Sequence, residues 1–301
     1  MIEIKRILCP VDFSEFSQHA VDHAVAIAGW YSATVTLLHV RALMPIAPAV
    51  PEMLPPMTLT ADDREELRTA LTRFVPAGTT VPFERDVVEG HAATEIVAHA
   101  NATRSDLLVL GTHGRSGFER LLLGSVTERV LRKAPCPVLS VPRPADGATP
   151  VAPVFKRILC AVDFSDCSLR ALDYALSLAQ EADARLTVLH VFDLEGAMSE
   201  HWRDRLTPPS LRKELETLED ERRERLSRAV PQDAGTYCDI EAVMTGGTPY
   251  REILRLAGEK QSELIVMGVH GRRAADILFF GSTTNNVVRQ APCPVLTIRQ
   301  A

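Results

Sequence analysis

Two glycine-rich segments with the same spacing hold the residue types best suited to binding a ligand. The pattern is Gly-x-x-Gly, nine residues, then Gly-Ser, and its positions are Gly111, Gly114, Gly124 and Ser125, and again Gly268, Gly271, Gly281 and Ser282. Glycine lets a backbone approach a ligand closely or take a positive φ. Each serine is expected to open a helix, whose N-terminus favours an anion. The spacing therefore predicts a polyphosphate cradle in each segment.

Charged and titratable side chains lie inside both segments. Arg115 and Arg272 would add guanidinium charge where each loop begins. His113 and His270 recur there too. They have two interpretations, a phosphate contact or acid–base group and a packing or loop hydrogen-bond role. The second is favoured because no partnered nucleophile is visible.

Helix capping is an alternative explanation for the serines. Ser125-x-x-Glu128 fits a capping box, in which the serine caps its own helix. The second segment has Asn285 in place of the glutamate. Capping therefore explains the first segment but not the recurrence of the whole spacing.

The chain repeats itself. Lys5–Val40 recurs as Lys156–Val191 with more than half of the positions identical, and Arg104–Pro142 recurs as Gln261–Arg299 with about half identical. Unrelated residues would agree at roughly one position in 17. We therefore expect two copies of one domain, 1–143 and 154–301, joined by a Pro-, Ala- and Gly-rich linker at 144–153.

Apolar strand-like runs alternate with helical patterns in each copy. The strands expected in the first copy are Ile4–Cys9, Thr34–Val40, Val81–Val88, Asp106–Leu110 and Val138–Val141. The helices expected are one beginning after an N-cap at Ser14, and Asp62–Phe74, Ala92–Ala102 and Ser125–Lys133. This order predicts an α/β fold, with a parallel sheet covered by helices on both faces. Ligands bind such sheets beyond the carboxyl ends of the strands.

Two stretches fit this scheme less well. Ala42–Met57 is rich in proline and is predicted to be a loop beside the site. Leu211–Arg228 is densely charged at helical spacing, which is typical of a solvated helix face. His19 and His23 are four residues apart and could hold a metal. The second copy has Arg170 and Tyr174 there, which favours an exposed helix face.

Composition excludes several classes of protein. The 301 residues hold 33 Lys and Arg against 39 Asp and Glu, a net charge of −6, which argues against a nucleic-acid-binding protein. No apolar run is long enough to cross a bilayer, and the six cysteines form no C-x-x-C pair. We expect a cytoplasmic protein with buried, reduced cysteines and no membrane or nucleic-acid partner.

These motifs together resemble the ATP-binding type of the universal stress protein family, in tandem. The resemblance rests on both glycine patterns, on Pro10-Val11-Asp12 and Ala161-Val162-Asp163, on the Leu-His-Val runs ending at Val40 and Val191, and on the Ala-Pro-Cys-Pro-Val runs. It covers nearly the whole chain except the middle segments and the linker. It implies two open-sheet domains, each a five-stranded parallel sheet in the order 3-2-1-4-5.

The resemblance also implies ATP as the ligand, with Mg²⁺, and a role for each matching position. Asp12 and Asp163 would contact the nucleoside, and the backbone of Val40 and Val191 would face the adenine. Ribose and phosphates would lie against the two glycine patterns. The residues expected at the sites are Pro10, Val11, Asp12, Val40, Gly111, His113, Gly114, Arg115, Gly124, Ser125 and Val126 in the first copy, and Ala161, Val162, Asp163, Val191, Gly268, His270, Gly271, Arg272, Gly281, Ser282 and Thr283 in the second.

Nucleotide binding in a stress response or in signalling is therefore the function expected. Dinucleotide-binding, Walker-type and nucleophile-elbow motifs are absent from the sequence, which argues mildly against an enzyme. The alternatives are a slow ATPase or autophosphorylating enzyme, and a scaffold that binds a different small ligand.

The last strand of each copy generates a prediction about assembly. Single-domain members of the family tend to dimerise through this strand, and Val138–Val141 and Val295–Ile298 are short, apolar edges that need a partner. We expect them to pair antiparallel within one chain, since a linker of about a dozen residues reaches roughly 40 Å. Leu139→Pro should weaken this contact. Crosslinking mass spectrometry on dilute monomer would contradict the prediction by finding links between chains, as in a homodimer, and none within a chain.

Overall fold

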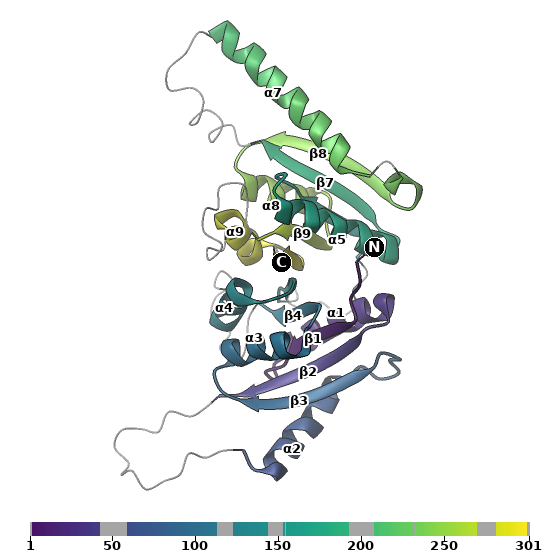
Figure 1. Cartoon of the computed structure of the whole chain (residues 1–301), viewed down its shortest axis with the longest axis vertical. Coiled ribbons are helices and arrows are strands. Elements are labelled where there is room, and N and C mark those ends of the chain that lie inside the picture. The colour runs from purple at the N-terminus through teal and green to yellow at the C-terminus, as the bar shows by residue number, and fades with distance from the viewer. Residues whose placement is uncertain are drawn as a thin grey trace, which may run out of the picture. The chain divides into compact units, whose positions relative to one another are not determined.

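The computed structural model describes residues 2–42, 59–112, 123–143, 153, 155–192, 208–231, 233–269 and 281–299, and for 208–216 the backbone alone. The chain divides into two compact units, Glu3–Pro153 and Val154–Gln300, each with its own core (Figure 1). From residue 43 on, the predicted Pro-rich loop lies outside the described residues.

The amino-terminal unit alternates strands and helices throughout. Its elements are β1 (Arg6–Pro10), α1 (Glu15–Tyr31), β2 (Thr34–Arg41), α2 (Ala61–Leu71), the 3₁₀ turn η1 (Thr72–Phe74), β3 (Phe83–Glu89), α3 (Ala92–Thr103), β4 (Leu107–Gly111), α4 (Ser125–Lys133) and β5 (Val138–Val141). The expected strands and helices all form, with most ends within two residues of the prediction; the helix expected over Asp62–Phe74 ends at Leu71 and its last three residues form η1.

The carboxy-terminal unit repeats this order with a longer second helix. Its elements are β6 (Arg157–Ala161), α5 (Asp166–Ala182), β7 (Arg185–Phe192), α7 (Pro208–Ala229), the 3₁₀ turn η2 (Ala234–Thr236), β8 (Asp239–Gly246), α8 (Pro249–Glu259), β9 (Leu264–Gly268), α9 (Ser282–Gln290) and β10 (Val295–Ile298). The expected charged helix is α7, and its described part from residue 217 is largely exposed.

All described strand pairs inside each unit are parallel. The order is β3-β2-β1-β4-β5 in the first unit and β8-β7-β6-β9-β10 in the second. This confirms the predicted α/β class and the order 3-2-1-4-5. The chain leaves β1 toward one edge and returns to β4 on the other side of it. The carboxyl ends of β1 and β4, and of β6 and β9, therefore flank the point where the order reverses.

Helices cover both faces because the connections run in both directions across the sheet. α1 and α2 belong to crossovers toward β3, and α3 and α4 to crossovers toward β5, so right-handed crossovers place the two pairs on opposite faces. α3 packs against α4, and α1 lies on β1 and β4. The central strands between these layers are mostly apolar and buried, as Leu8, Val109 and Leu139 illustrate, whereas the outer strands β3 and β8 are largely accessible.

The first helix begins where the sequence predicts but buries more than expected. Ser14 is its N-cap and accepts a hydrogen bond from the backbone N–H of Ser17. The expected exposed face at His19 and His23 is wrong for His23, which is only 4% exposed. Its Nδ1–H donates to the carbonyl of His19 at 2.8 Å. Alanines such as Ala20 and Ala24 let α1 lie close enough to the sheet to cover this ring.

Burial of His23 predicts a loss of stability in mild acid. Burial lowers its pKa from the usual 6.5 to about 4, so the folded chain keeps the ring neutral where the unfolded chain protonates it. The stability this confers is complete above pH 6.5 and is lost as pH falls toward 4. His23→Gln should lessen the drop in unfolding free energy between pH 7 and 4.5 by about 2 kcal/mol in urea titrations. His91→Gln, at an exposed position, is the control, and equal pH slopes for His23→Gln and wild type would refute the prediction.

Candidate functional site

A tight turn follows the first strand of each unit and fixes an aspartate at the carboxyl edge. The Oδ1 atom of Asp12 accepts hydrogen bonds from the Ser14 backbone N–H at 3.1 Å and from the Ser17 hydroxyl at 2.6 Å. The Ser17 hydroxyl in turn accepts from the Asp12 backbone N–H at 3.0 Å. These bonds hold the half-buried carboxylate in one orientation, so it can serve as a positioned acceptor for a ligand.

The second unit builds the same turn with one change. Asp163 Oδ1 accepts from the Ser165 backbone N–H at 3.0 Å and from its hydroxyl at 2.6 Å. The Ser168 hydroxyl donates instead to the Ser165 carbonyl at 2.9 Å. It still accepts from the Asp163 backbone N–H, at 3.2 Å. Asp12 therefore accepts a hydrogen bond from Ser17, whereas the corresponding Ser168 hydroxyl donates to a backbone carbonyl rather than to Asp163.

A phenylalanine in the left-handed region makes each turn possible. Phe13 has φ 62° and Phe164 has φ 63°, a conformation that is uncommon for a bulky residue. Each ring packs against a histidine on the neighbouring strand, with centroids 4.4 Å apart for Phe13–His39 and for Phe164–His190. Two copies of the same unfavourable conformation indicate that the turn is required there.

The same histidines hold the ends of two adjacent strands together. The His39 Nδ1–H donates to the Val11 carbonyl at 2.7 Å, and the His190 Nδ1–H to the Val162 carbonyl at 2.7 Å. A carbonyl can only accept, which defines the tautomer. The bond fixes β1 relative to β2, and β6 relative to β7, just before Val40 and Val191. The backbone expected to face the adenine is therefore positioned by a side chain on the preceding residue.

Hydrogen bonds also tie together the two ends of the first glycine-rich segment. The Gly124 N–H donates to the Thr112 carbonyl at 2.8 Å, and the Thr127 hydroxyl to the Gly111 carbonyl at 2.7 Å. In the second unit the Gly281 N–H donates to the Val269 carbonyl at 3.3 Å, and the Thr284 hydroxyl to the Gly268 carbonyl at 3.1 Å. The N-terminus of α4 or α9 is thus held against the end of β4 or β9.

Glycine is required at this junction by space. A Cβ on Gly124 would lie 3.0 Å from the Thr112 carbonyl oxygen, and one on Gly281 would lie 2.9 Å from that of Val269. Gly124 and Gly281 are the N-caps of their helices, so the capping role proposed for Ser125 is wrong. Ser125 and Ser282 instead begin the helices and are exposed at their positive ends.

Two arginines of α7 stack on phenylalanine rings of the carboxy-terminal unit. The Cζ of Arg225 lies 4.5 Å from the Phe164 ring centroid and that of Arg222 lies 4.9 Å from the Phe192 ring centroid. In the first unit Phe74 lies against Phe13 instead, with centroids 5.8 Å apart. The ring that follows the aspartate is therefore covered by a positive charge in the second unit and by another aromatic ring in the first.

The cysteine side chains of both units are poorly placed to react. The cysteine thiols are all buried, and burial raises the pKa values of Cys136 and Cys293 to about 12, which makes them poor nucleophiles. Within the described ranges no group of three or more His, Cys, Asp or Glu side chains is placed to hold a metal ion. In the same residues no helix is both long and apolar enough to cross a bilayer.

Most of the residues expected at the sites lie at the carboxyl edges. The structure places there Pro10, Val11, Asp12, Val40, Gly111, Gly124, Ser125 and Val126, and Ala161, Val162, Asp163, Val191, Gly268, Gly281, Ser282 and Thr283. Val11 and Val162 are buried, so they offer backbone rather than side chains. His113, Gly114, Arg115, His270, Gly271 and Arg272 lie outside the described residues.

Sequence reasoning named Ser14 as an N-cap and the Leu-His-Val runs as motifs, but it did not assign the residues that support these positions. They are the serines of the turns, the phenylalanines in the left-handed region, the histidines of the second strands and the threonines of the loop junctions. Their recurrence in both copies, as Phe-Ser-x-x-Ser, Leu-His-Val and Gly-Ser-x-Thr, was the available signal.

Comparisons with known proteins place this arrangement in a family. A model of the universal stress protein family matches residues 3–142 and again residues 155–299. A universal stress protein of Methanocaldococcus jannaschii is 37% identical over 143 residues, which cover 46% of this chain and 83% of that protein. One of Mycolicibacterium smegmatis is 28% identical over 303 residues, covering 97% and 96%. The crystal structure of an Archaeoglobus fulgidus universal stress protein shares the fold over all of both chains, with a TM-score of 0.69 at 23% identity.

The threonine at the loop junction generates a prediction. Thr127→Val removes the hydroxyl that donates to the Gly111 carbonyl and leaves that acceptor without its side-chain partner. We expect a loss of about 1 kcal/mol in unfolding free energy and faster amide hydrogen exchange at residues 123–128. Thr94→Val, at an exposed position on α3, is the matched control. Unchanged exchange in Thr127→Val would show that the junction does not depend on this bond.

Proposed function

Because the chain belongs to the universal stress protein family, we propose that each of its two units binds ATP at the carboxyl edge of its sheet. One observation carries the proposal: both units hold a glycine at a helix N-terminus against the end of the fourth strand of the sheet, beside a fixed aspartate. A phosphate chain needs such close backbone and a positive helix end. A nucleoside needs a fixed acceptor, which Asp12 and Asp163 supply.

The nucleotide would bring Mg²⁺ with it. Mg²⁺ is usually held by one or two carboxylates together with substrate phosphates rather than by a protein cage. Asp12 or Asp163 offers one carboxylate at each edge. Mg²⁺ would neutralise phosphate charge in a chain whose net charge is −6.

We propose nucleotide occupancy, rather than turnover, as the working signal of a cytoplasmic protein in a stress response. The buried thiols, with pKa values raised by burial, are poor nucleophiles. Two experiments distinguish this proposal from a slow enzyme and from a scaffold that binds a different ligand. Thin-layer analysis of labelled ATP would favour an enzyme if hydrolysis by the protein exceeds the blank. Mass spectrometry of the ligand released from purified protein would favour a scaffold if no adenine nucleotide is present.

Two sites in one chain give a measurable stoichiometry. Calorimetric titration with ATP and Mg²⁺ should give a value near two per chain. Asp12→Ala should weaken the first site and Asp163→Ala the second, each by about 5- to 150-fold, because a polar contact to the ligand is lost. Each variant should therefore keep one site at full affinity.

Asp183→Ala is the control, since Asp183 is an exposed acid at the end of α5, just before β7 begins and therefore at the opposite edge of the sheet. It has the same change of charge and should keep both sites. A wild-type stoichiometry near one would mean that only one unit binds. Unchanged affinity at both sites in the Asp12→Ala, Asp163→Ala double variant would overturn the assignment of the aspartates.

A further inference from the structure

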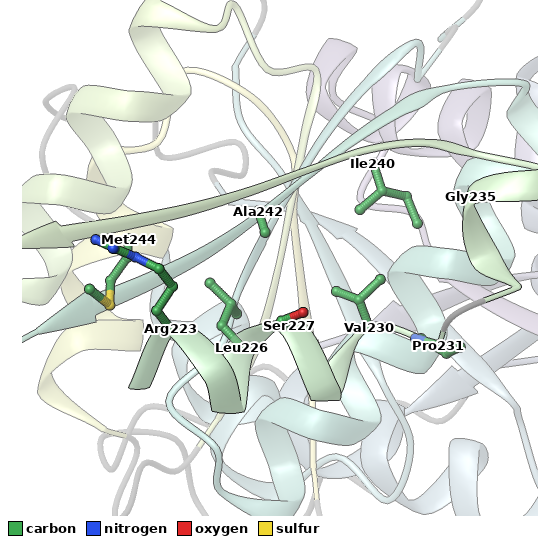
Figure 2. Close-up of a pocket in the computed structure, with 9 residues that line it drawn as sticks. All are labelled: Arg223, Leu226, Ser227, Val230, Pro231, Gly235, Ile240, Ala242 and Met244. Carbon is green, nitrogen blue, oxygen red and sulfur yellow. The ribbon is translucent and has the colours of Figure 1, made fainter. Parts of the chain in front are cut away.

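A groove separates α7 from β8, the edge strand of the carboxy-terminal unit. Its volume is about 440 Å³. Its lining is Arg223, Leu226, Ser227, Val230, Pro231, Gly235, Ile240, Ala242 and Met244 (Figure 2). Most of these side chains are apolar, although the groove is open to solvent.

The groove has an apolar length and one charged end. In Figure 2, Leu226 and Val230 point from the helix toward Ile240 and Ala242 on the strand. Ile240 to Met244 spans roughly 13 Å of extended chain. Arg223 lies at one end, beside Met244, and the turn at Pro231 and Gly235 lies at the other.

The internal repeat shows why this groove is open. Leu71-Thr-Arg-Phe-Val-Pro76 in the first copy corresponds to Leu226-Ser-Arg-Ala-Val-Pro231 in the second. The strand pairing in each unit likewise places Arg85 of β3 where β8 has Ala242. Arg85 reaches across from its strand and donates a hydrogen bond to the Thr72 hydroxyl. The second copy reduces that long side chain to a methyl group opposite Ser227, so nothing from the strand bridges the gap there.

The guanidinium of Arg223, at the end of the groove, makes only a weak ion pair. Arg223 pairs with Asp220 on its own helix at 3.9 Å, and both side chains are more than two-thirds exposed. Such a pair contributes little and is readily exchanged for another carboxylate. A guanidinium is well suited to bind a carboxylate in two-point geometry.

We propose that this groove binds a medium-chain carboxylate, such as a fatty acid. Its hydrocarbon chain lies along Leu226, Val230, Ile240 and Ala242, and its carboxylate lies at Arg223. The length of the groove matches a chain such as decanoate. Burial of each methylene against these side chains contributes to affinity, and the arginine sets the direction of the ligand.

The whole chain should be titrated with decanoate below its micelle concentration, followed by calorimetry and by the methyl signal of Met244. Met244→Leu assigns that signal. We expect saturable binding at one site and a shift of the Met244 methyl. Octanoate should bind at least four-fold more weakly, because each fully buried methylene is worth about a four-fold change.

Three variants locate the ligand. Ala242→Arg restores the residue of the first copy at an exposed position and should weaken decanoate at least ten-fold by filling the groove. Arg223→Ala should weaken decanoate about three- to five-fold and leave decanol unchanged. Arg228→Ala, which removes an exposed arginine of α7 outside the lining, should change neither.

The opposite results would overturn the proposal. Decanoate binding that is not saturable, or that persists in Ala242→Arg, would exclude the groove. An equal loss of decanoate affinity in Arg228→Ala and Arg223→Ala would show that the net charge of the helix, and not a contact with Arg223, attracts the ligand. A concentration-dependent dimer that Ala242→Arg disrupts would identify a second copy of the chain as the occupant instead.

Discussion

The hydrogen bonds between an aspartate and the first turn of the following helix are the interaction on which each carboxyl edge depends. In a parallel sheet every strand ends at the same edge, and the chain must turn at once into a crossover helix. Asp12 and Asp163 organise that turn through the backbone N–H groups and hydroxyls of Ser14 and Ser165. The bonds compensate for a phenylalanine with positive φ. The carboxylate that stabilises the turn is thereby also held in one orientation, in which a ligand could bind it.

The rest of the edge is built by tying strand ends to one another. His39 and His190 connect the first two strands of each sheet, and Thr127 and Thr284 connect the fourth strand to the helix after the loop. All of these bonds are repeated in both units. The proposed site lies at the switch point in the sheet, where the connections after β1 and β4, or after β6 and β9, run toward opposite edges of the sheet.

The two copies differ away from this edge. Leu67 and Ala70 of the first copy correspond to Arg222 and Arg225 of the second, while Phe74 corresponds to Ala229. The space over the ring after the aspartate is filled by Phe74 in one unit and by the Arg225 guanidinium in the other. Apart from the bond made by Ser168, the hydrogen bonds of the carboxyl edge recur in both units, whereas the outer helix and the outer strand differ, and Ala242 in place of Arg85 leaves a groove.

The sequence by itself determined the repeat, the α/β class, the strand order through the family resemblance, and the glycines and aspartates at the strand ends. Apolar period and residue type carry that information locally. It did not reveal that His23 is buried, that Gly124 rather than Ser125 caps its helix, or that Arg85 and Ala242 decide whether a groove is filled. Those outcomes depend on atoms far apart in the chain, such as the Thr112 carbonyl that excludes a Cβ at Gly124. Only tertiary packing brings such atoms within contact distance, so only the structure decided them.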